Sequence, residues 1–163
     1  MNIQKKFFQR IRILLLAAAS GTPFLQGTAQ DMKPTLFLIS DTHLDTQWNW
    51  NVKTTINDYI YKTMTENMAL MDKYPSFLLN YEGAIKYMWM KEYYPAEFER
   101  LKSYVASGQW HVSGLSVDAN DVMISSAESI LRNMLYANHF YMKEFGVRGG
   151  YDIMLPDCFG FSY

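Results

Sequence analysis

The residues best suited to chemistry stand together in "SDTHLDTQWNW", residues 40–50. This stretch ends an apolar run and carries Asp41, His43 and Asp45 beside two tryptophans. In extended backbone, side chains two residues apart project to the same side, so His43 and Asp45 can point at one ion. Mixed nitrogen and oxygen ligands suit zinc best, with manganese or cobalt as alternatives. The stretch therefore predicts one side of a small polar site.

A further candidate ligand, Asp157, follows the apolar segment "YDIMLP" near the end of the chain. Together with His43 and Asp45 it would leave coordination positions open for water or substrate, as in catalytic zinc sites. His-x-Asp alone is a weak signal, because such residues also serve as caps and surface groups. The simpler role for Asp157, which follows a proline, is in a turn or helix cap. Trp48 is expected over the site and Trp50 in the core.

Strand-like and helix-like segments alternate along the chain. Short β-rich runs occupy residues 35–40, 76–83, 109–114 and 151–157, and helical patterns occupy residues 53–73, 84–107 and 125–146. Pro95 is expected to begin a second helix within 84–107, and Gly108 to end it. Ser125 and Glu128 have the spacing of a capping box. The alternation predicts an α/β fold with a mostly parallel sheet and crossover helices.

Ligands of such folds bind beyond the carboxyl ends of the strands. Polar or metal-competent side chains follow every predicted strand: Asp41, His43 and Asp45, then Glu82, then Ser113 and Asp118, then Asp157. We expect Asp118 and Asp121 to be solvated loop residues and Glu82 to be a cap. The methionine-rich stripe of residues 53–73 is expected to be packing material.

Residues 1–30 have the composition of a secretory signal, and residues 31–163 form the predicted mature chain. Four basic residues precede the apolar run "ILLLAAAS", which is too short to span a bilayer comfortably. We therefore expect export to the periplasm or the extracellular space, with no stable membrane insertion after cleavage. Removal of this segment leaves 11 basic and 16 acidic residues, a balance that argues against nucleic acid as a partner.

Two motifs in this order resemble family 38 of the glycoside hydrolases, the retaining α-mannosidases. "DTHLDTQWNW" is similar to the family's His-x-Asp-x-x-Trp motif after a strand, and "LPDCFGFS" to its second motif, an Asp in a Pro/Phe/Gly setting. The resemblance covers about residues 35–163. It implies an incomplete α/β barrel-like glycoside hydrolase domain, and its substrates would be mannose-containing glycans or oligosaccharides.

The resemblance also implies roles for particular residues. His43, Asp45 and Asp157 match the ligands of a Zn²⁺ ion, and Asp157 also matches the catalytic nucleophile of a retaining mechanism. Trp48 and Phe159 match aromatic residues that line the sugar subsite. The family's remaining metal ligand, a His, and its acid/base Asp lie beyond Tyr163, so we expect a truncated catalytic domain with little activity alone. Cys158 and Leu44 depart from the pattern of eukaryotic members.

Two other functions fit the same residues. A metal-dependent hydrolase such as a deacetylase would use zinc-bound water and would need no carboxylate nucleophile. A non-catalytic exported module would hold glycans against its aromatic side chains and would bind them without a metal.

Overall fold

The computed structural model describes residues 34–148 and 152–161. The predicted signal segment, residues 1–30, lies outside the described residues. The chain divides into two units, Met1–Phe37 and Leu38–Tyr163, and every element below belongs to the second. Among the described residues, no helix has both the length and the apolar character that a membrane span requires.

Three short strands form a parallel sheet: β1 (Ser40–Thr42), β2 (Leu79–Glu82) and β3 (Trp110–Ser113). They lie in the order β1-β2-β3, so neighbours in the sequence are neighbours in the sheet. Thr42 of β1 pairs with Tyr81 of β2, which pairs with Val112 of β3. The carboxyl ends of all three strands therefore meet at one edge, as the sequence predicts.

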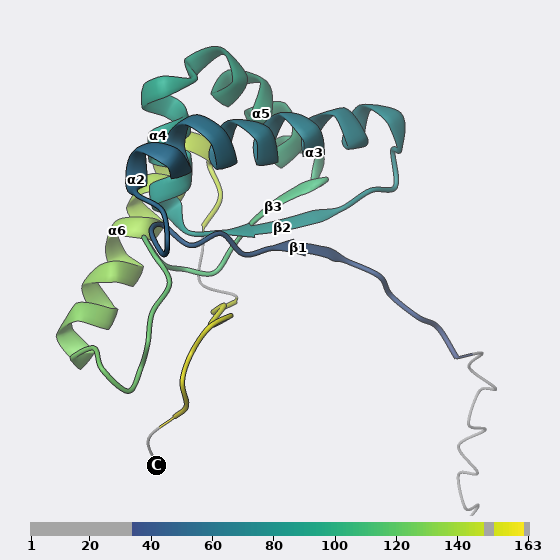
Figure 1. Ribbon diagram of the computed structural model, residues 1–163. Coiled ribbons are helices and arrows are strands. Elements are labelled where there is room, and N and C mark those ends of the chain that lie inside the picture. The colour runs from purple at the N-terminus through teal and green to yellow at the C-terminus, as the bar shows by residue number, and fades with distance from the viewer. Residues whose placement is uncertain (1–33, 149–151, 162–163) are drawn as a thin grey trace, which may run out of the picture. The chain divides into compact units, whose positions relative to one another are not determined.

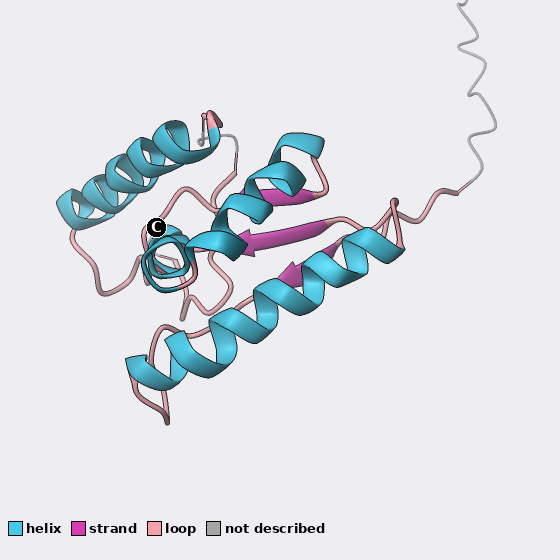
Figure 2. Cartoon of the chain, turned by 90° about the horizontal axis from the view of Figure 1, so that it is seen from above, coloured by secondary structure: helices cyan, strands magenta, loops and turns pink. Residues whose placement is uncertain are grey.

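The helices connect and follow these strands. They are α2 (Val52–Thr54), the π-helical turn η1 (Thr55–Ile60), α3 (Tyr61–Lys73), α4 (Ala84–Tyr93), α5 (Pro95–Ser107) and α6 (Ala127–Phe145). Pro95 begins α5 and Gly108, with φ of 80°, ends it, which confirms both predictions. Right-handed crossovers between strands in sequential order bring their helices to the same face. Figure 1 shows α3 and α5 on one side of the sheet, and Figure 2 shows helices passing over the strands.

Only one face of the sheet is apolar. Leu79 and Tyr81 of β2 are buried against the helices, whereas Asn80 between them pairs with Asp41 and His111 on the opposite face. The methionine stripe of α3 packs into the same core, as predicted: Met64, Met68 and Met71. The α/β class and the parallel sheet are therefore confirmed.

Tyrosines occupy the centre of the core. Tyr87 donates a hydrogen bond to the carbonyl oxygen of Tyr81 (2.8 Å) and accepts one from the indole of Trp110 (2.9 Å). The hydroxyls of Tyr81 and Tyr141 are buried without a hydrogen-bond partner among the described residues. Burial, followed by the charge of Glu82, raises the pKa of Tyr81 and of Tyr141 far above the usual value, so both stay neutral.

The predictions for two strands were wrong: one strand is displaced along the sequence, and the other is absent from the described residues. The first run was placed at residues 35–40, but β1 spans Ser40–Thr42 because its partner β2 begins only at Leu79. Asp41, which was expected to follow the strand, is consequently an exposed residue within β1. The fourth strand, predicted at 151–157, is absent from described residues 152–161. An apolar run shows β-propensity, but a strand also needs a partner backbone, which the run does not reveal.

The start of α6 is also shifted by one residue from the prediction. Ser126, not Ser125, is the N-cap, and its hydroxyl accepts a hydrogen bond from the amide of Ser129 (3.1 Å). Glu128 pairs with Arg132 one turn later and so does not complete a capping box. Gly146 ends the helix in the left-handed conformation, as expected.

The tyrosine core yields a matched pair of mutations. Tyr87→Phe should lower the free energy of unfolding by about 1–3 kcal/mol, because it leaves a buried indole N–H and a carbonyl without their partner. Tyr81→Phe should leave it unchanged or raise it, because that hydroxyl has no described partner to lose. Urea unfolding followed by tryptophan fluorescence measures both changes, and equal losses in the two variants would contradict this account.

Candidate active site

The site begins where β1 and β2 end. His43 directly follows Thr42, and Glu82 directly follows Tyr81, the register partner of Thr42. The parallel ladder thus places His43 beside Glu82, and His43 Nδ1 lies 3.2 Å from Glu82 Oε1. Asp45 lies two residues further on, with its Oδ1 3.4 Å from His43 Nε2. The sequence expectation that His43 and Asp45 face a common point agrees with this geometry.

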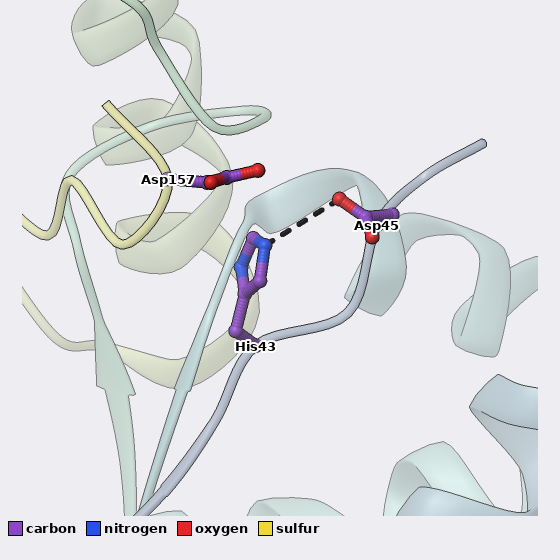
Figure 3. A group of neighbouring side chains, drawn as sticks. All are labelled: His43, Asp45 and Asp157. Atoms are coloured by element: carbon purple, nitrogen blue, oxygen red, sulfur yellow. Dashed lines mark ion pairs between the residues drawn. The ribbon is translucent and has the colours of Figure 1, made fainter. Parts of the chain in front are cut away.

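Asp157 approaches the same point from the other end of the chain. One ligand atom each of His43, Asp45 and Asp157 lies within 4.8 Å of the other two. These three residues form a group that could hold a metal ion. Figure 3 shows Asp157 opposite His43 and Asp45, with all three side chains around a shared space. The group is partly open to solvent, so an ion and a ligand can both reach it.

The last segment is held in place by contacts with the end of β3. The amide of Gly114 donates to Asp152 Oδ2 (3.0 Å), and the amide of Leu115 donates to the Asp152 carbonyl oxygen (3.3 Å). His111 Nε2 lies 3.5 Å from Asp152 Oδ2. These contacts tie Asp152 to the sheet edge, and the five residues that follow carry the chain to Asp157. The segment therefore reaches the site without forming the strand that its pattern suggested.

A charged network that the sequence did not reveal lies behind His43. Glu82 is 1% exposed and pairs with Lys86 of α4, whose side chain is fully buried (3.1 Å). Lys86 also pairs with Asp118 (3.3 Å), which accepts a hydrogen bond from Thr46 (2.7 Å). Asp118 is therefore a network residue and not simply a solvated one. The prediction that Glu82 is a cap was wrong: Gly83 is the N-cap of α4, and the Glu82 side chain pairs with His43 and Lys86 instead. The four-residue spacing of Glu82 and Lys86 was the available signal, but it crosses a strand–helix junction.

The predicted sugar-contacting aromatics are exposed. Trp48 is 72% exposed and Phe159 is 83% exposed, and neither belongs to the core. Trp48 packs edge-on against Trp50, with ring centroids 5.8 Å apart. Trp50 in turn donates to Thr55 Oγ1 (2.9 Å) and contacts Tyr59, so it is the more structural of the two indoles. It is only partly buried and lies outside the core cluster, so its predicted core position was wrong. Exposed rings near a polar site can serve as stacking surfaces, and that role remains a prediction for both residues.

Side chains that could hold a metal ion thus lie at the carboxyl ends of the parallel strands, the edge where α/β domains bind their ligands. Residues 33–163 match the glycosyl hydrolases family 38 N-terminal domain. This match covers most of the chain, which therefore belongs to glycosyl hydrolase family 38, as its two motifs indicated.

Curated relatives agree with this assignment. Alpha-mannosidase G of Dictyostelium discoideum is 33% identical over 127 residues, which are 78% of this chain and 12% of the relative. Human alpha-mannosidase 2C1 is 27% identical over 90% of this chain and 14% of its own length. Alpha-mannosidase of Saccharomyces cerevisiae is 28% identical over 88% and 13%, respectively. The chain thus spans about an eighth of the length of these relatives.

Gly114 brings the last segment close to Glu82, and this contact can be tested. Its φ is +65°, and a Cβ there would lie 3.0 Å from Met154 Cβ and 3.4 Å from Glu82 Cβ. Gly114→Ala should therefore lower the free energy of unfolding through backbone strain, about 1–2 kcal/mol, plus about 1–3 kcal/mol from overpacking. Denaturant titration of the 163-residue chain measures the sum of the two losses.

Gly108 provides the matched control. Its φ is +80°, but a Cβ there meets nothing within 4 Å. Gly108→Ala should therefore show the backbone strain alone. A loss for Gly114→Ala no larger than that for Gly108→Ala would mean that the last segment does not pack closely against Gly114.

Proposed function

We propose that this chain forms the metal-binding part of an α-mannosidase catalytic domain that hydrolyses terminal α-mannosides in glycans with retention of configuration. The observation that carries the proposal is the convergence of His43, Asp45 and Asp157 at the carboxyl end of a family 38 domain. The names of the relatives support α-mannosides as the substrate class.

The donor set fits a zinc ion. His43 offers an imidazole nitrogen, and Asp45 and Asp157 offer carboxylate oxygens, a combination that zinc accepts readily. Three protein ligands from this chain leave room for a further ligand and for sugar hydroxyls. When bound, the cation would supply Lewis acidity that holds and orients those hydroxyls beside Asp157.

Asp157 is the proposed nucleophile. Its carboxylate oxygen would attack the anomeric carbon, the bond to the leaving-group oxygen would break, and that oxygen would take a proton from a separate carboxylic acid. Water would then hydrolyse the glycosyl ester and return the proton to that acid. Asp118 and Asp121 are poor candidates for the acid, because Asp118 holds Thr46 and Lys86, and Asp121 caps the amide of Met123 (2.8 Å).

The proposal predicts a metal-dependent mannosidase with Asp157 as nucleophile. In the purified native gene product, Asp157→Asn should lower kcat on an aryl α-mannoside about a thousandfold or more. A chelator should abolish turnover and Zn²⁺ should restore it. Incubation with a 2-deoxy-2-fluoro mannosyl fluoride should add one glycosyl group to the peptide that contains Asp157, as detected by mass spectrometry.

Asp58→Asn, a change at an exposed carboxylate on η1, is the matched control and should leave turnover unchanged. Chelator-sensitive hydrolysis of acetylated sugars without a glycosyl adduct would favour the deacetylase alternative. Glycan binding that withstands the chelator, with no turnover by the native gene product, would favour a non-catalytic binding module.

We also infer that residues 1–30 direct export of the protein, on the basis of the basic and apolar pattern of this segment. The mature protein recovered from its native host should then lack this segment. Intact-mass measurement together with N-terminal sequencing tests this, and a protein recovered with residues 1–30 in place would contradict it.

A further inference from the structure

The buried pair of Glu82 and Lys86 has no place in the reaction proposed above. Glu82 is 1% exposed, the Lys86 side chain is fully buried, and their charged atoms lie 3.1 Å apart. Glu82 Oε2 has no hydrogen-bond partner among the described residues. Apolar residues of similar volume usually replace a buried ion pair without loss of stability. This pair therefore calls for a role other than holding the fold together.

Glu82 makes one contact that bears directly on the site. Its Oε1 lies 3.2 Å from His43 Nδ1, while His43 Nε2 lies on the side of Asp45, 3.4 Å from Oδ1. A carboxylate paired with a lysine can only accept a hydrogen bond, so Nδ1 must be the nitrogen that donates. The neutral imidazole then carries its proton on Nδ1, and the lone pair of Nε2 is free on the side that faces Asp45 and Asp157 (Figure 3).

Lys86 contacts the same carboxylate oxygen as His43, Glu82 Oε1, and returns the network to the loop of His43. Its Nζ lies 3.3 Å from Asp118 Oδ1, which accepts a hydrogen bond from Thr46 (2.7 Å). His43 and Thr46 stand at the two ends of the four-residue segment that carries Asp45. The segment is thus held at both ends by one connected set of charges.

Gly83 provides the space that this arrangement needs. It separates Glu82 from α4 with a φ of +87°, and a Cβ there would lie 2.6 Å from Lys86 Nζ. The absent side chain lets Lys86 fold back over Gly83 to reach Glu82. A glycine at the strand–helix junction is therefore required for the contact between Lys86 and Glu82.

We propose that Glu82 and Lys86 are positioning residues, in which Glu82 holds His43 in the Nδ1–H tautomer and Lys86 fixes the Glu82 carboxylate. The consequence for metal binding rests on the proposed zinc site, but the tautomer itself does not depend on a metal. Carboxylates that hold a ligating histidine in this way typically contribute about 10- to 100-fold to metal affinity.

The test reads the tautomer and the metal affinity separately. Multiple-bond ¹H–¹⁵N NMR of the metal-free chain at about pH 9, above the usual range of histidine titration, reports which nitrogen of His43 carries the proton. Competition with a chromophoric chelator gives the affinity for Zn²⁺, and urea unfolding gives stability. His43→Gln assigns the resonance among the three histidines of the chain.

Two double variants differ only in the hydrogen-bond acceptor at position 82. In E82M/K86M both charges and the acceptor are lost. We expect unchanged or higher stability, a shift of His43 toward the Nε2–H tautomer, and about 10- to 100-fold weaker Zn²⁺ binding. In E82Q/K86M the amide oxygen can still accept from Nδ1–H, but the amide NH₂ can also donate to an unprotonated Nδ1, so part of the Nδ1–H tautomer and of the affinity should return. A purely structural role would make these two variants alike.

A second ion pair supplies the control. Lys91 and Glu144 are 2.7 Å apart and the Glu144 side chain is only 7% exposed. Among the described residues, the further ion-pair partner of Glu144 is Lys102, which is not a site residue. K91M/E144M should leave both the tautomer and the affinity unchanged.

Wild-type His43 in the Nε2–H form, or E82M/K86M with wild-type tautomer and affinity, would overturn the proposal. The Nδ1–H tautomer together with no Zn²⁺ binding by the native gene product would support the positioning role and refute the metal site instead.

Discussion

The register of the three parallel strands is the constraint on which the site depends. Thr42, Tyr81 and Val112 stand side by side, so the residues that follow each of them emerge at one edge of the sheet. His43 and Glu82 meet there although 39 residues separate them along the chain. A shift of one residue in the β1–β2 register would turn His43 toward the helices and separate it from Glu82. The apolar packing of Leu79 and Tyr81 under the helices fixes which face β2 turns toward the core.

The edge of the sheet combines rigid and open parts. The core tyrosines and methionines, the buried Glu82–Lys86 pair and the glycine at position 83 fix the base of the site. The outer part is more exposed: Trp48, Phe159 and the carboxylate of Asp157 all face solvent. Such a division suits the proposed glycosidase function, in which the proposed metal ligands would keep their geometry while a sugar enters and leaves. Membership of family 38 and the α-mannosidase relatives are consistent with this arrangement.

Sequence patterns succeeded where the information is local or repeated. The period of the methionines predicted α3, Pro95 and Gly108 marked the ends of α5, and strand–helix alternation predicted a parallel sheet. They failed where strand formation depends on pairing with another segment of backbone. The apolar run at 35–40 contains only the first residue of β1, and the run near 152–157 is tied to the sheet through Asp152 without becoming a strand.

The sequence by itself determined which residue types are available and on which side of a strand they emerge. His43 and Asp45 could be recognised because they are two residues apart, and Asp157 because its motif resembles a known one. Only the tertiary structure decided that Asp157 meets them, since no local rule connects residues more than 100 positions apart. It alone revealed Glu82, Lys86 and Asp118 as one network. The burial of Glu82 and Lys86 and their contact with Asp118 depend on the folded chain, because the three residues come from different elements.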